Sequence, residues 1–400
     1  MKVIELSVSN FSKAAKAIAL TGAEPYSVNI MAAKAVHKVF LARGIDNRAA
    51  NILKQDMLSL GGEVAVSRQV GAMKTGTSDA VVMGTLKQIA LLCGKLRSQP
   101  FGLAELSLEL LRLTEIKSGN KYFLCRNHKI KISADARLMG VLNVTPDSFS
   151  DGGKYFDLET ACARGAELVK YGALIVDIGG ESSRPGARPV SAKDEAARIL
   201  PVIKTLAGKI KAPLSVDTYK PETARAALKA GASIINDISG LGYGGRKMAR
   251  LIASEKAGLV IMHMKGKPSD MQKAPKYDDL VSEIYDFFEE RSSLALECGV
   301  RKESIMLDPG IGFGKTAEHN LELLKRLKEF KSLGFPLVVG TSRKSFLGKV
   351  LGLENPLERL QGSVASALWA SDHGADFLRV HDVMETAQAL KIYGAIKASA

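Results

Sequence analysis

The chain of 400 residues lacks the sequence features of membrane and secreted proteins. No uninterrupted apolar stretch approaches the roughly 20 residues that a membrane-spanning helix needs. The first ten residues, MKVIELSVSN, contain no apolar signal-peptide core after Lys2. Hydrophobic residues at 46% and charged residues at 24% are ordinary for a globular protein. We therefore expect a cytoplasmic protein that makes no contact with a membrane and buries a large core.

The sequence also lacks the residue spacings of disulfide frameworks and zinc sites. Its four cysteines, Cys93, Cys125, Cys162 and Cys298, are far apart and form no CxxC pair. This spacing predicts reduced thiols. The six histidines form no HxxxH or HExxH pattern. A zinc site built by the protein is therefore not expected.

Positive charge is concentrated in the first third of the chain. Residues 1–133 contain 19 Lys and Arg against 9 Asp and Glu, which is a net charge of +10 out of +14 for the whole chain. A strongly basic surface can bind an anionic partner. No aromatic-rich or arginine-rich nucleic-acid motif accompanies the charge, so a solvated basic surface is the preferred interpretation. We do not expect nucleic acid as a partner.

Apolar runs of strand length alternate with longer amphipathic segments from about residue 134 onward. The expected strands are residues 138–143, 173–178, 214–217, 233–236, 259–263, 304–308, 337–340 and 377–380. The expected helices include residues 158–171, 193–206, 221–230, 277–298, 319–330 and 356–373. Strands that alternate with helices predict βαβ units around a parallel sheet. The nearly continuous apolar character of each strand fits burial on both faces.

Two α/β architectures are compatible with this alternation. Eight units within residues 134–400 match the (β/α)₈ TIM barrel, which needs about 250 residues. The alternative is an open, doubly wound sheet, which binds its ligand at one crevice where the strand order reverses. Polar residues follow nearly every expected strand, which favours a ring of loops at one mouth of a barrel.

Residues 1–133 are predicted to form a smaller domain with a different pattern. Helices are expected at residues 29–43, 48–60, 84–96 and 101–115, and strands at residues 62–70 and 80–83. This mixture predicts an α/β or α+β domain. Residues 122–131 predict a strand that leads into the barrel. No motif in this part of the chain indicates a chemical activity.

Polar residues at the ends of the expected strands are the candidate site. The active sites of such barrels are built at the carboxyl ends of the strands. The residues at these ends are Asn143, Asp177, Asp217, Asn236, His263, Asp308, Lys344, Arg379 and His381. One acidic residue at a strand end can simply cap the next helix. A full ring of such residues is not explained by capping.

Two carboxylates and an amide in this ring suit a planar heterocycle. Asp217, Asn236 and Asp308 lie in the motifs SVDT, IINDIS and LDPGIGFGK. A carboxylate accepts two adjacent N–H hydrogen bonds side by side, and charge-assisted bonds of this kind are strong. The alternative is that these side chains serve as helix caps or as buried structural groups.

A second group of residues suits an anion such as a phosphate. Arg184, Lys344, Arg379 and His381 follow different strands, and an arginine matches phosphate oxygens with a rigid fork. Ser345 lies near the start of the seventh barrel helix, where the helix terminus favours anions. Surface salt bridges are the alternative explanation for these cations.

Two long polar loops follow the first two strands of the expected barrel. Residues 145–153 contain Asp147 and Asp151, and residues 182–189 contain the sequence SSRPGARP. Long loops of this kind, rich in glycine and proline, are candidates for lids over an active site.

The motifs of residues 134–400 resemble those of the dihydropteroate synthase family, in the family's order. The matching motifs are GVLNVTPDSFSDGG, DIGGESSRPGA, SVDTYKPE, GASIINDISG, MHMKGKPSDMQ, DPGIGFGKTAEHN, GTSRKSFLG and RVHDV. The resemblance implies a transferase of folate biosynthesis, which is the target of sulfonamides. It condenses 6-hydroxymethyl-7,8-dihydropterin diphosphate with 4-aminobenzoate to give 7,8-dihydropteroate and pyrophosphate. The resemblance also implies a homodimer and a requirement for Mg²⁺.

The resemblance assigns roles to individual residues. The positions that bind the pterin are matched by Asp217, Asn236, Asp308, Phe313 and Lys344. The positions that bind the diphosphate are matched by Asn143, Arg184, Arg379 and His381, and Asn143 also matches the position that helps to hold Mg²⁺. The positions near the aminobenzoate are matched by Ser183, Pro185 and Ser345. The residues expected to act in catalysis are Asn143, Asp147, Asp151, Arg184, Lys344, Arg379 and His381.

One position departs from the family, and two other functions compete with the synthase. The family usually has Thr where this chain has Ser183, and we expect the lost methyl group to alter packing around the aminobenzoate ring. The main competing function is a pterin-binding corrinoid methyltransferase component, which would not need the SSRPGA, SRKS or RVHDV motifs. The second is a non-catalytic barrel that serves as a scaffold for the basic N-terminal domain.

Overall fold

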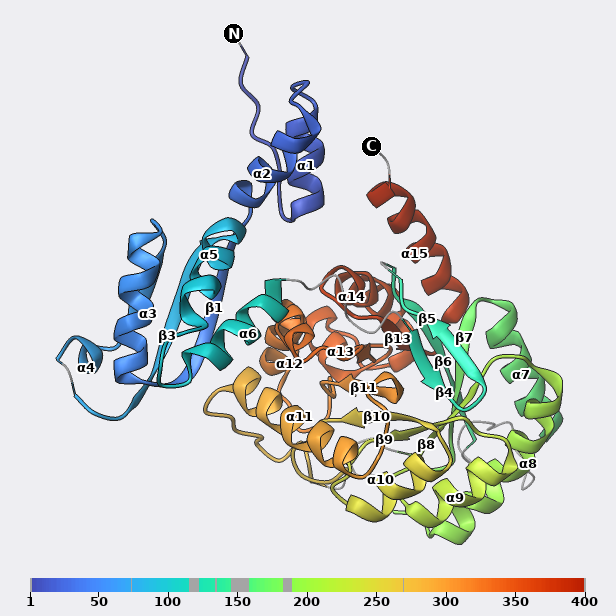
Figure 1. Ribbon diagram of the computed structural model, residues 1–400. Coiled ribbons are helices and arrows are strands. Elements are labelled where there is room, and N and C mark those ends of the chain that lie inside the picture. Colours follow the sequence, from blue (N-terminus) through green and yellow to red (C-terminus); the bar gives the residue numbers. More distant parts are fainter. Residues whose placement is uncertain are drawn as a thin grey trace. The chain divides into compact units, whose positions relative to one another are not determined.

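The computed structural model describes residues 2–72, 74–114, 122–133, 135–144, 158–182, 189–268 and 270–398. The chain divides into two compact units, Met1–Ser118 and Gly119–Ala400. Figure 1 colours the first unit in blue to cyan and the second in green to red. The division comes before the expected boundary at residue 133, because a hairpin of β4 (Tyr122–Cys125) and β5 (His128–Lys131) packs with the barrel core.

The first unit is built on a three-stranded antiparallel sheet. Its strands are β1 (His37–Asp46), β2 (Glu63–Val66) and β3 (Thr77–Thr85), in the order β1-β3-β2. Its helices are α1 (Phe11–Ala19), α2 (Pro25–Ala35), α3 (Asn47–Ser59), α4 (Arg68–Gly71), α5 (Leu86–Leu96) and α6 (Leu103–Thr114). The core of the sheet and its helices includes Leu53, Met57, Val64, Val82, Ile89 and Leu92. Helices beside an antiparallel sheet make this unit α+β.

Strand β1 occupies part of the segment that was expected to be helical. Helix α2 ends at Ala35, and the chain continues as a strand in which exposed and half-buried side chains alternate. His37 pairs with Thr85 of β3, and the ladder continues to Asp46 opposite Thr77. The prediction of a helix through residue 43 was therefore wrong, because long-range strand pairing decides the structure of a segment with weak local preference.

The second unit is a closed barrel of eight parallel strands. The strands are β6 (Arg137–Asn143), β7 (Ala173–Gly179), β8 (Leu214–Asp217), β9 (Ile234–Asp237), β10 (Gly258–Met262), β11 (Ile305–Asp308), β12 (Val338–Val339) and β13 (Phe377–Val380). Their order is β11-β10-β9-β8-β7-β6-β13-β12, and a parallel bridge between Leu307 and Leu337 closes the ring. The predicted (β/α)₈ barrel is confirmed.

Helices cover the outside of the barrel, as Figure 1 shows. They are α7 (Leu158–Lys170), α8 (Ala192–Lys209), α9 (Pro221–Ala230), α10 (Gly245–Ser254), α11 (Leu280–Glu297), α12 (Ala317–Lys325), α13 (Ser345–Leu351), α14 (Leu360–Asp372) and α15 (Val383–Ala398). Short 3₁₀ turns η3 (Lys302–Ser304), η4 (Leu327–Leu333) and η5 (Pro356–Arg359) join some of them. No helix among the described residues is long and apolar enough to cross a membrane.

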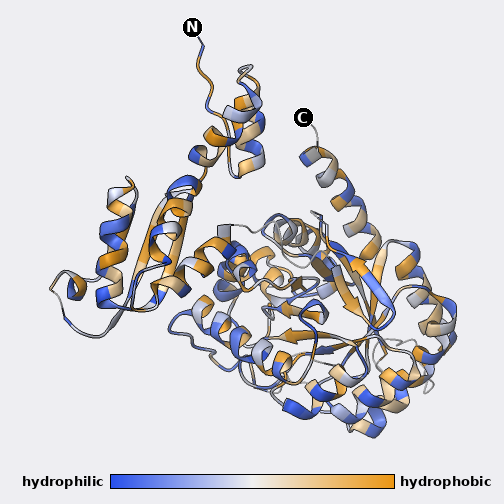
Figure 2. Ribbon diagram, in the orientation of Figure 1, coloured by the Kyte–Doolittle hydropathy of each residue, from blue (hydrophilic) through white to orange (hydrophobic). Residues whose placement is uncertain are grey.

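Alternation along the strands separates the interior of the barrel from the layer beneath the helices. Residues of one parity, such as Val176, Val216 and Ile261, belong to the large core shared with the helices. Residues of the other parity form the lower interior layer with the hairpin: Met139, Ile175, Ile234, Val260, Met306, Val338, Phe377 and Phe123. Figure 2 shows the apolar character of the barrel strands in orange. The next inward residue of each strand lies two positions further on, toward the carboxyl ends.

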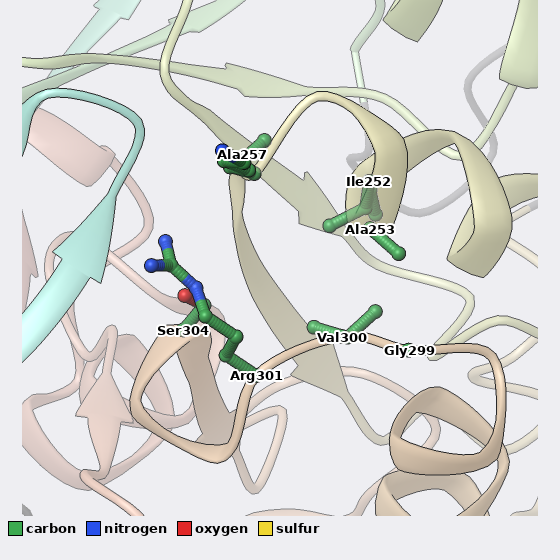
Figure 3. Close-up of a pocket in the computed structure, with 8 residues that line it drawn as sticks. Ile252, Ala253, Ala257, Gly299, Val300, Arg301 and Ser304 are labelled. Carbon is green, nitrogen blue, oxygen red and sulfur yellow. The ribbon is translucent and has the colours of Figure 1, made fainter.

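The opposite end of the barrel contains a small cavity that is drawn in Figure 3. Its volume is about 190 Å³, and its lining residues come from the end of α10, from the segment between α10 and β10, and from the segment between α11 and β11. They are Ile252, Ala253, Lys256, Ala257, Gly299, Val300, Arg301 and Ser304. None of the predicted site residues lies in this cavity, which is at the amino ends of the strands.

Candidate active site

Strand parity brings the predicted polar residues together inside the barrel. Asp177, Asn236, Asp308 and Arg379 each lie two positions after a residue of the apolar interior layer, and Asp217 ends β8 on the same side as its neighbours. All four acidic and amide side chains are buried, with exposures from 0% for Asp177 to 9% for Asp217. The apolar interior of the barrel thus ends in a polar layer at the carboxyl ends of the strands.

An arginine held by two carboxylates lies within this layer. Arg379 Nε donates to Asp177 Oδ2 at 2.6 Å, and Arg379 Nη2 donates to Asp217 Oδ2 at 2.8 Å. Asn236 Nδ2 donates to the same Asp177 oxygen at 3.2 Å. Asp177 was predicted to lie at a strand end, with no role in binding or catalysis. In the structure it joins two residues that were predicted to bind different parts of a ligand.

Asp308 and Lys344 form the other side of the polar layer. Asp308 Oδ1 accepts a hydrogen bond from the Gly310 amide at 2.7 Å. Lys344 is the N-cap residue of α13, and its Nζ donates to the Ile311 carbonyl. The same Nζ lies 4.6 Å from the centroid of the Phe313 ring. A cation, a carboxylate and an aromatic face are therefore adjacent.

Burial shifts the pKa values of ionisable groups in this layer toward neutral pH. Burial raises the pKa of Asp217 to about 7, even though Arg379 opposes the shift. Burial lowers the pKa of Lys344 to about 8, and the charge of Asp308 limits the decrease. The pKa of Asp308 is also raised by its burial. Ionisable groups with such shifts are typical of sites that bind or transform polar ligands.

An apolar surface lies beside the polar layer. Ile238, Met262, Met271 and Phe313 form a buried cluster, and Tyr219 packs against it. Apolar walls with a few converging polar groups are typical of small-molecule sites. The combination suits a flat heterocycle whose edge carries hydrogen-bond donors.

The glycines of the DPGIGFGK motif allow the chain to pass directly against the segment that follows β10. Gly310 has a φ of +67°, and a Cβ there would lie 1.9 Å from the His263 carbonyl oxygen. Gly314 has a φ of +63°, and a Cβ would lie 2.1 Å from the Lys265 carbonyl oxygen. No residue with a side chain fits at either position. This close packing holds Phe313 in the wall of the site.

A buried lysine and histidine beneath this segment were not predicted to interact. Lys315 is 2% exposed, and its Nζ lies 2.9 Å from His263 Nδ1 and 3.0 Å from the Phe313 carbonyl oxygen. Burial lowers the pKa of His263 to about 2 and the pKa of Lys315 well below its ordinary value. A neutral histidine can accept a hydrogen bond from Lys315. The only signal in the sequence is the position of Lys315 at the end of the glycine-rich motif.

Three predicted site residues, Asn143, Ser345 and His381, lie around the rim of the polar layer, whereas Lys344 and Arg379 lie within it. His381 follows β13, and its Nδ1 lies 3.1 Å from Ser342 Oγ. Ser345 is exposed as the first residue of α13. Asn143 ends β6 opposite Gly179, where a Cβ would lie 3.6 Å from Asn143 Oδ1. The segment before α13 is held by an unpredicted ion pair in which Arg343 Nε lies 3.1 Å from Asp382 Oδ2.

Five predicted site residues lie outside the described residues: Asp147, Asp151, Ser183, Arg184 and Pro185. Glu181, which lies just before the second loop, belongs to a buried ionic cluster. Lys220 Nζ contacts Glu195 Oε2 at 2.8 Å and also pairs with Glu181. Tyr219 donates to Glu181 Oε1 at 3.1 Å. This cluster joins the end of β7 to the segment after Asp217.

The described residues include no group of three or more His, Cys, Asp and Glu side chains that could hold a metal ion. Mg²⁺ prefers oxygen ligands, keeps several waters, and is often bound by one protein oxygen together with substrate phosphates. The Asn143 amide oxygen at the end of β6 fits this donor chemistry. The residues present are therefore compatible with Mg²⁺ that arrives with a diphosphate.

Comparisons with known proteins agree with this geometry. Residues 139–381 match the family model of pterin-binding enzymes. The dihydropteroate synthase of Synechocystis sp. is 49% identical over 259 residues, which are 65% of this chain and 89% of that protein. The structure of Xanthomonas albilineans dihydropteroate synthase with 4-aminobenzoic acid has 43% identity and a TM-score of 0.66, and the match covers 70% of this chain and 99% of that one.

One relative also matches the first unit. The probable bifunctional folylpolyglutamate synthase/dihydropteroate synthase of Halobacterium salinarum is 42% identical over 400 residues. The match covers 99% of this chain but only 47% of that protein, so this chain spans about half of its length. By its motifs, its barrel and these matches, the chain belongs to the pterin-binding enzyme family, and within it to the dihydropteroate synthases of folate biosynthesis.

Proposed function

We propose that the polar layer at the carboxyl ends of the strands condenses 6-hydroxymethyl-7,8-dihydropterin diphosphate with 4-aminobenzoate. One observation supports the assignment of this reaction to the polar layer. Asp217, Asn236 and Asp308 come together inside the barrel, next to Lys344 and the face of the Phe313 ring. Acceptors, a cation and an aromatic wall are what a flat pterin with N–H donors at its edge requires.

Each polar residue has a defined part in binding the pterin. Asp308 and Asp217 accept hydrogen bonds from ring N–H groups, and the buried setting strengthens these bonds. Asn236 supplies an amide, whose Oδ1 has no hydrogen-bond partner among the described residues. Lys344 donates to an acceptor on the ring. Phe313 packs against the ring face.

Arg379 of the polar layer and His381 at its rim hold the diphosphate. Arg379 lies in β13 and His381 lies directly after it, two positions further on, so their side chains point to the same side. We expect Arg184 to join them, and Asn143 to supply an oxygen ligand for Mg²⁺ bound with the diphosphate. The metal ion would supply Lewis-acid stabilisation of the leaving group.

The reaction is a substitution at the exocyclic methylene carbon of the pterin. The C–O bond to the diphosphate breaks, and its electron pair leaves with pyrophosphate. The amine of 4-aminobenzoate forms the new C–N bond with its lone pair and then loses a proton to solvent. The electron-rich ring delocalises the positive charge that develops on the carbon. The protein contributes positioning and electrostatic stabilisation and forms no covalent bond to the substrate.

The aminobenzoate is assigned to the start of α13. We expect Ser345 near its carboxylate and Ser183 and Pro185 beside its ring, with Asp147 and Asp151 completing the site when both substrates are bound. Water that reached the developing cation would compete with the amine, so a closed site favours condensation.

We further propose that the protein is a cytoplasmic homodimer. Support for the dimer comes from exposed apolar side chains on the last elements of the barrel, which include Leu357, Trp369 and Ile392, at 66%, 48% and 64% exposure. Support for the compartment comes from four cysteines that form no disulfide. Burial raises the pKa of the Cys125 thiol to about 12, which keeps it protonated and unreactive.

Pyrophosphate release by the full chain tests the proposed function. Release should require the dihydropterin diphosphate, 4-aminobenzoate and Mg²⁺ together, and dihydropteroate should form in equal amount. Asp308→Asn should abolish release, whereas Asp372→Asn, at an exposed carboxylate paired with Lys397, should not change it. Pterin binding without release would contradict the proposal and favour the corrinoid methyltransferase function.

A further inference from the structure

We infer that Asp177 is a positioning residue that orients Arg379 and Asn236 together and thereby couples the pterin subsite to the diphosphate subsite. This inference rests on the proposed function, which assigns Asn236 to the ring and Arg379 to the diphosphate. Asp177 itself is 0% exposed. It therefore acts through its neighbours and does not touch the substrate.

The hydrogen bonds of Asp177 explain how it acts. Its Oδ2 accepts from Arg379 Nε at 2.6 Å and from Asn236 Nδ2 at 3.2 Å. A bond to Nε fixes the plane of the guanidinium group, because Nε is the nitrogen attached to the side-chain stem. A bond to Nδ2 makes the amide oxygen of Asn236 face away from Asp177. One carboxylate oxygen thus sets the direction of both groups.

The second carboxylate on Arg379 cannot provide this orientation during the reaction. Asp217 Oδ2 accepts from Arg379 Nη2 at 2.8 Å. The pterin N–H groups compete for the same carboxylate when the substrate binds. Asp177 lies out of reach of the substrate, so its bond to Nε persists. Arg379 Nη1 makes no hydrogen bond within the described residues, and it can donate to the diphosphate while Nε is held.

Stability does not account for Asp177. A buried ion pair is often no more stabilising than apolar side chains of similar volume. Asp177 Oδ1 has no hydrogen-bond partner among the described residues, and an unpaired buried acceptor is unfavourable. Ser215 pairs with Asp177 in the β7–β8 ladder and is also 0% exposed. Its Oγ likewise has no partner among the described residues, so Ser215 provides a matched control.

Asp177→Asn tests the inference by steady-state kinetics on the full chain. Arg379 and Asn236 both donate to Asp177 Oδ2, so the amide of the variant can accept from them only through its oxygen. Its NH₂ group then replaces the acceptor Oδ1 with a donor. We expect kcat/KM for the dihydropterin diphosphate to fall about 10- to 100-fold, which is the effect of losing a carboxylate that orients a ligand of a metal ion. KM for 4-aminobenzoate should not change. Ser215→Ala should leave all parameters at their wild-type values.

The pH profile separates positioning from a merely structural role. The charge of Asp177 is one of the causes that raise the pKa of Asp217. The charged groups that act on Asp217 from the surrounding elements are Arg379, Asp177, Glu195, Glu181 and Lys344. Loss of the Asp177 charge should move the acidic limb of kcat/KM to lower pH. A lower melting temperature with unchanged kinetics and an unchanged pH profile would overturn the inference.

A measurement on the wild-type chain covers the case in which Asp177→Asn does not fold. The Arg379 Nε–H resonance, observed by ¹⁵N NMR after selective arginine labelling, should stay at its hydrogen-bonded position when the dihydropterin diphosphate is added. A shift to the position of a free arginine would overturn the inference. A wild-type protein that passes the NMR test but forms no dihydropteroate would contradict the proposed function alone.

Discussion

Replacement of Asp217 with asparagine is expected to stabilise the barrel above neutral pH while it lowers activity. Burial raises the pKa of Asp217 from 3.8 to about 7. The folded chain therefore binds this proton more tightly than the unfolded chain does. The resulting stability is fully present below the unfolded pKa and is lost as the pH rises through the folded pKa. The rise in the pKa of Asp217 corresponds to at most about 4 kcal/mol at pH 8, and loss of the ion pair with Arg379 reduces the gain from Asp217→Asn.

The single tryptophan makes this prediction measurable in the intact two-unit chain. Trp369 lies in α14 and donates from Nε1 to the Leu324 carbonyl at 3.0 Å, so its fluorescence reports unfolding of the barrel. The urea midpoint of Asp217→Asn should rise relative to that of the wild type as the pH increases from about 5 to about 8. The variant should also lose about 10- to 100-fold in kcat/KM, because it lacks a charge-assisted bond worth about 1.5–3 kcal/mol. An Asp217→Asn protein that is less stable than wild type by the same amount at both pH values would refute the reasoning.

Three further predictions concern packing, binding and assembly. Gly314→Ala should lower the free energy of unfolding by about 2–3 kcal/mol, because its Cβ would lie 2.1 Å from the Lys265 carbonyl oxygen. Gly352→Ala is the control, since Gly352 has a similar φ of +69° but no atom near its Cβ position, and it should lose only about 1 kcal/mol. Trp fluorescence measures both changes. Phe313→Ala should weaken binding of the dihydropterin diphosphate about 10-fold or more in calorimetry without a change in KM for 4-aminobenzoate, and equal affinity would exclude the aromatic wall. Ile392→Lys should convert a dimer to a monomer in light scattering, and a monomeric wild type would contradict the proposed assembly.

The barrel could be predicted from the sequence because its signals are local. Each strand is a short apolar run that ends in a polar residue, and the structure confirms the strand positions from residue 137 to residue 380. The strand β1 could not be predicted in the same way. Residues 37–46 carry no strong local preference, and they form a strand through pairing with residues 77–85. Long-range pairing of this kind is invisible in a local window.

The membership of the site was more predictable than its internal contacts. Strand ends identified Asp217, Asn236, Asp308 and Arg379, and strand parity placed all four inside the barrel. The ion pair between Asp177 and Arg379 joins residues that are 202 positions apart. Only the register of β6 between β7 and β13 makes that contact possible. No spacing along the chain carries this information.

One end of the barrel interior stabilises the fold, and the other end contains the functional site. The lower layer is apolar and is sealed by the hairpin, with Phe123 and Phe377 in an edge-to-face contact at 6.1 Å. The upper layer contains buried ionisable groups whose charged forms are disfavoured by burial, as the raised pKa of Asp217 and the lowered pKa of Lys344 show. Truncation of Phe377 should therefore destabilise the fold through a cavity, whereas neutralisation of Asp217 should stabilise it above neutral pH and weaken binding. Because both layers come from the same eight strands, a one-residue slip of a single strand would turn its polar residue toward the helices, so the register that packs the core also assembles the site.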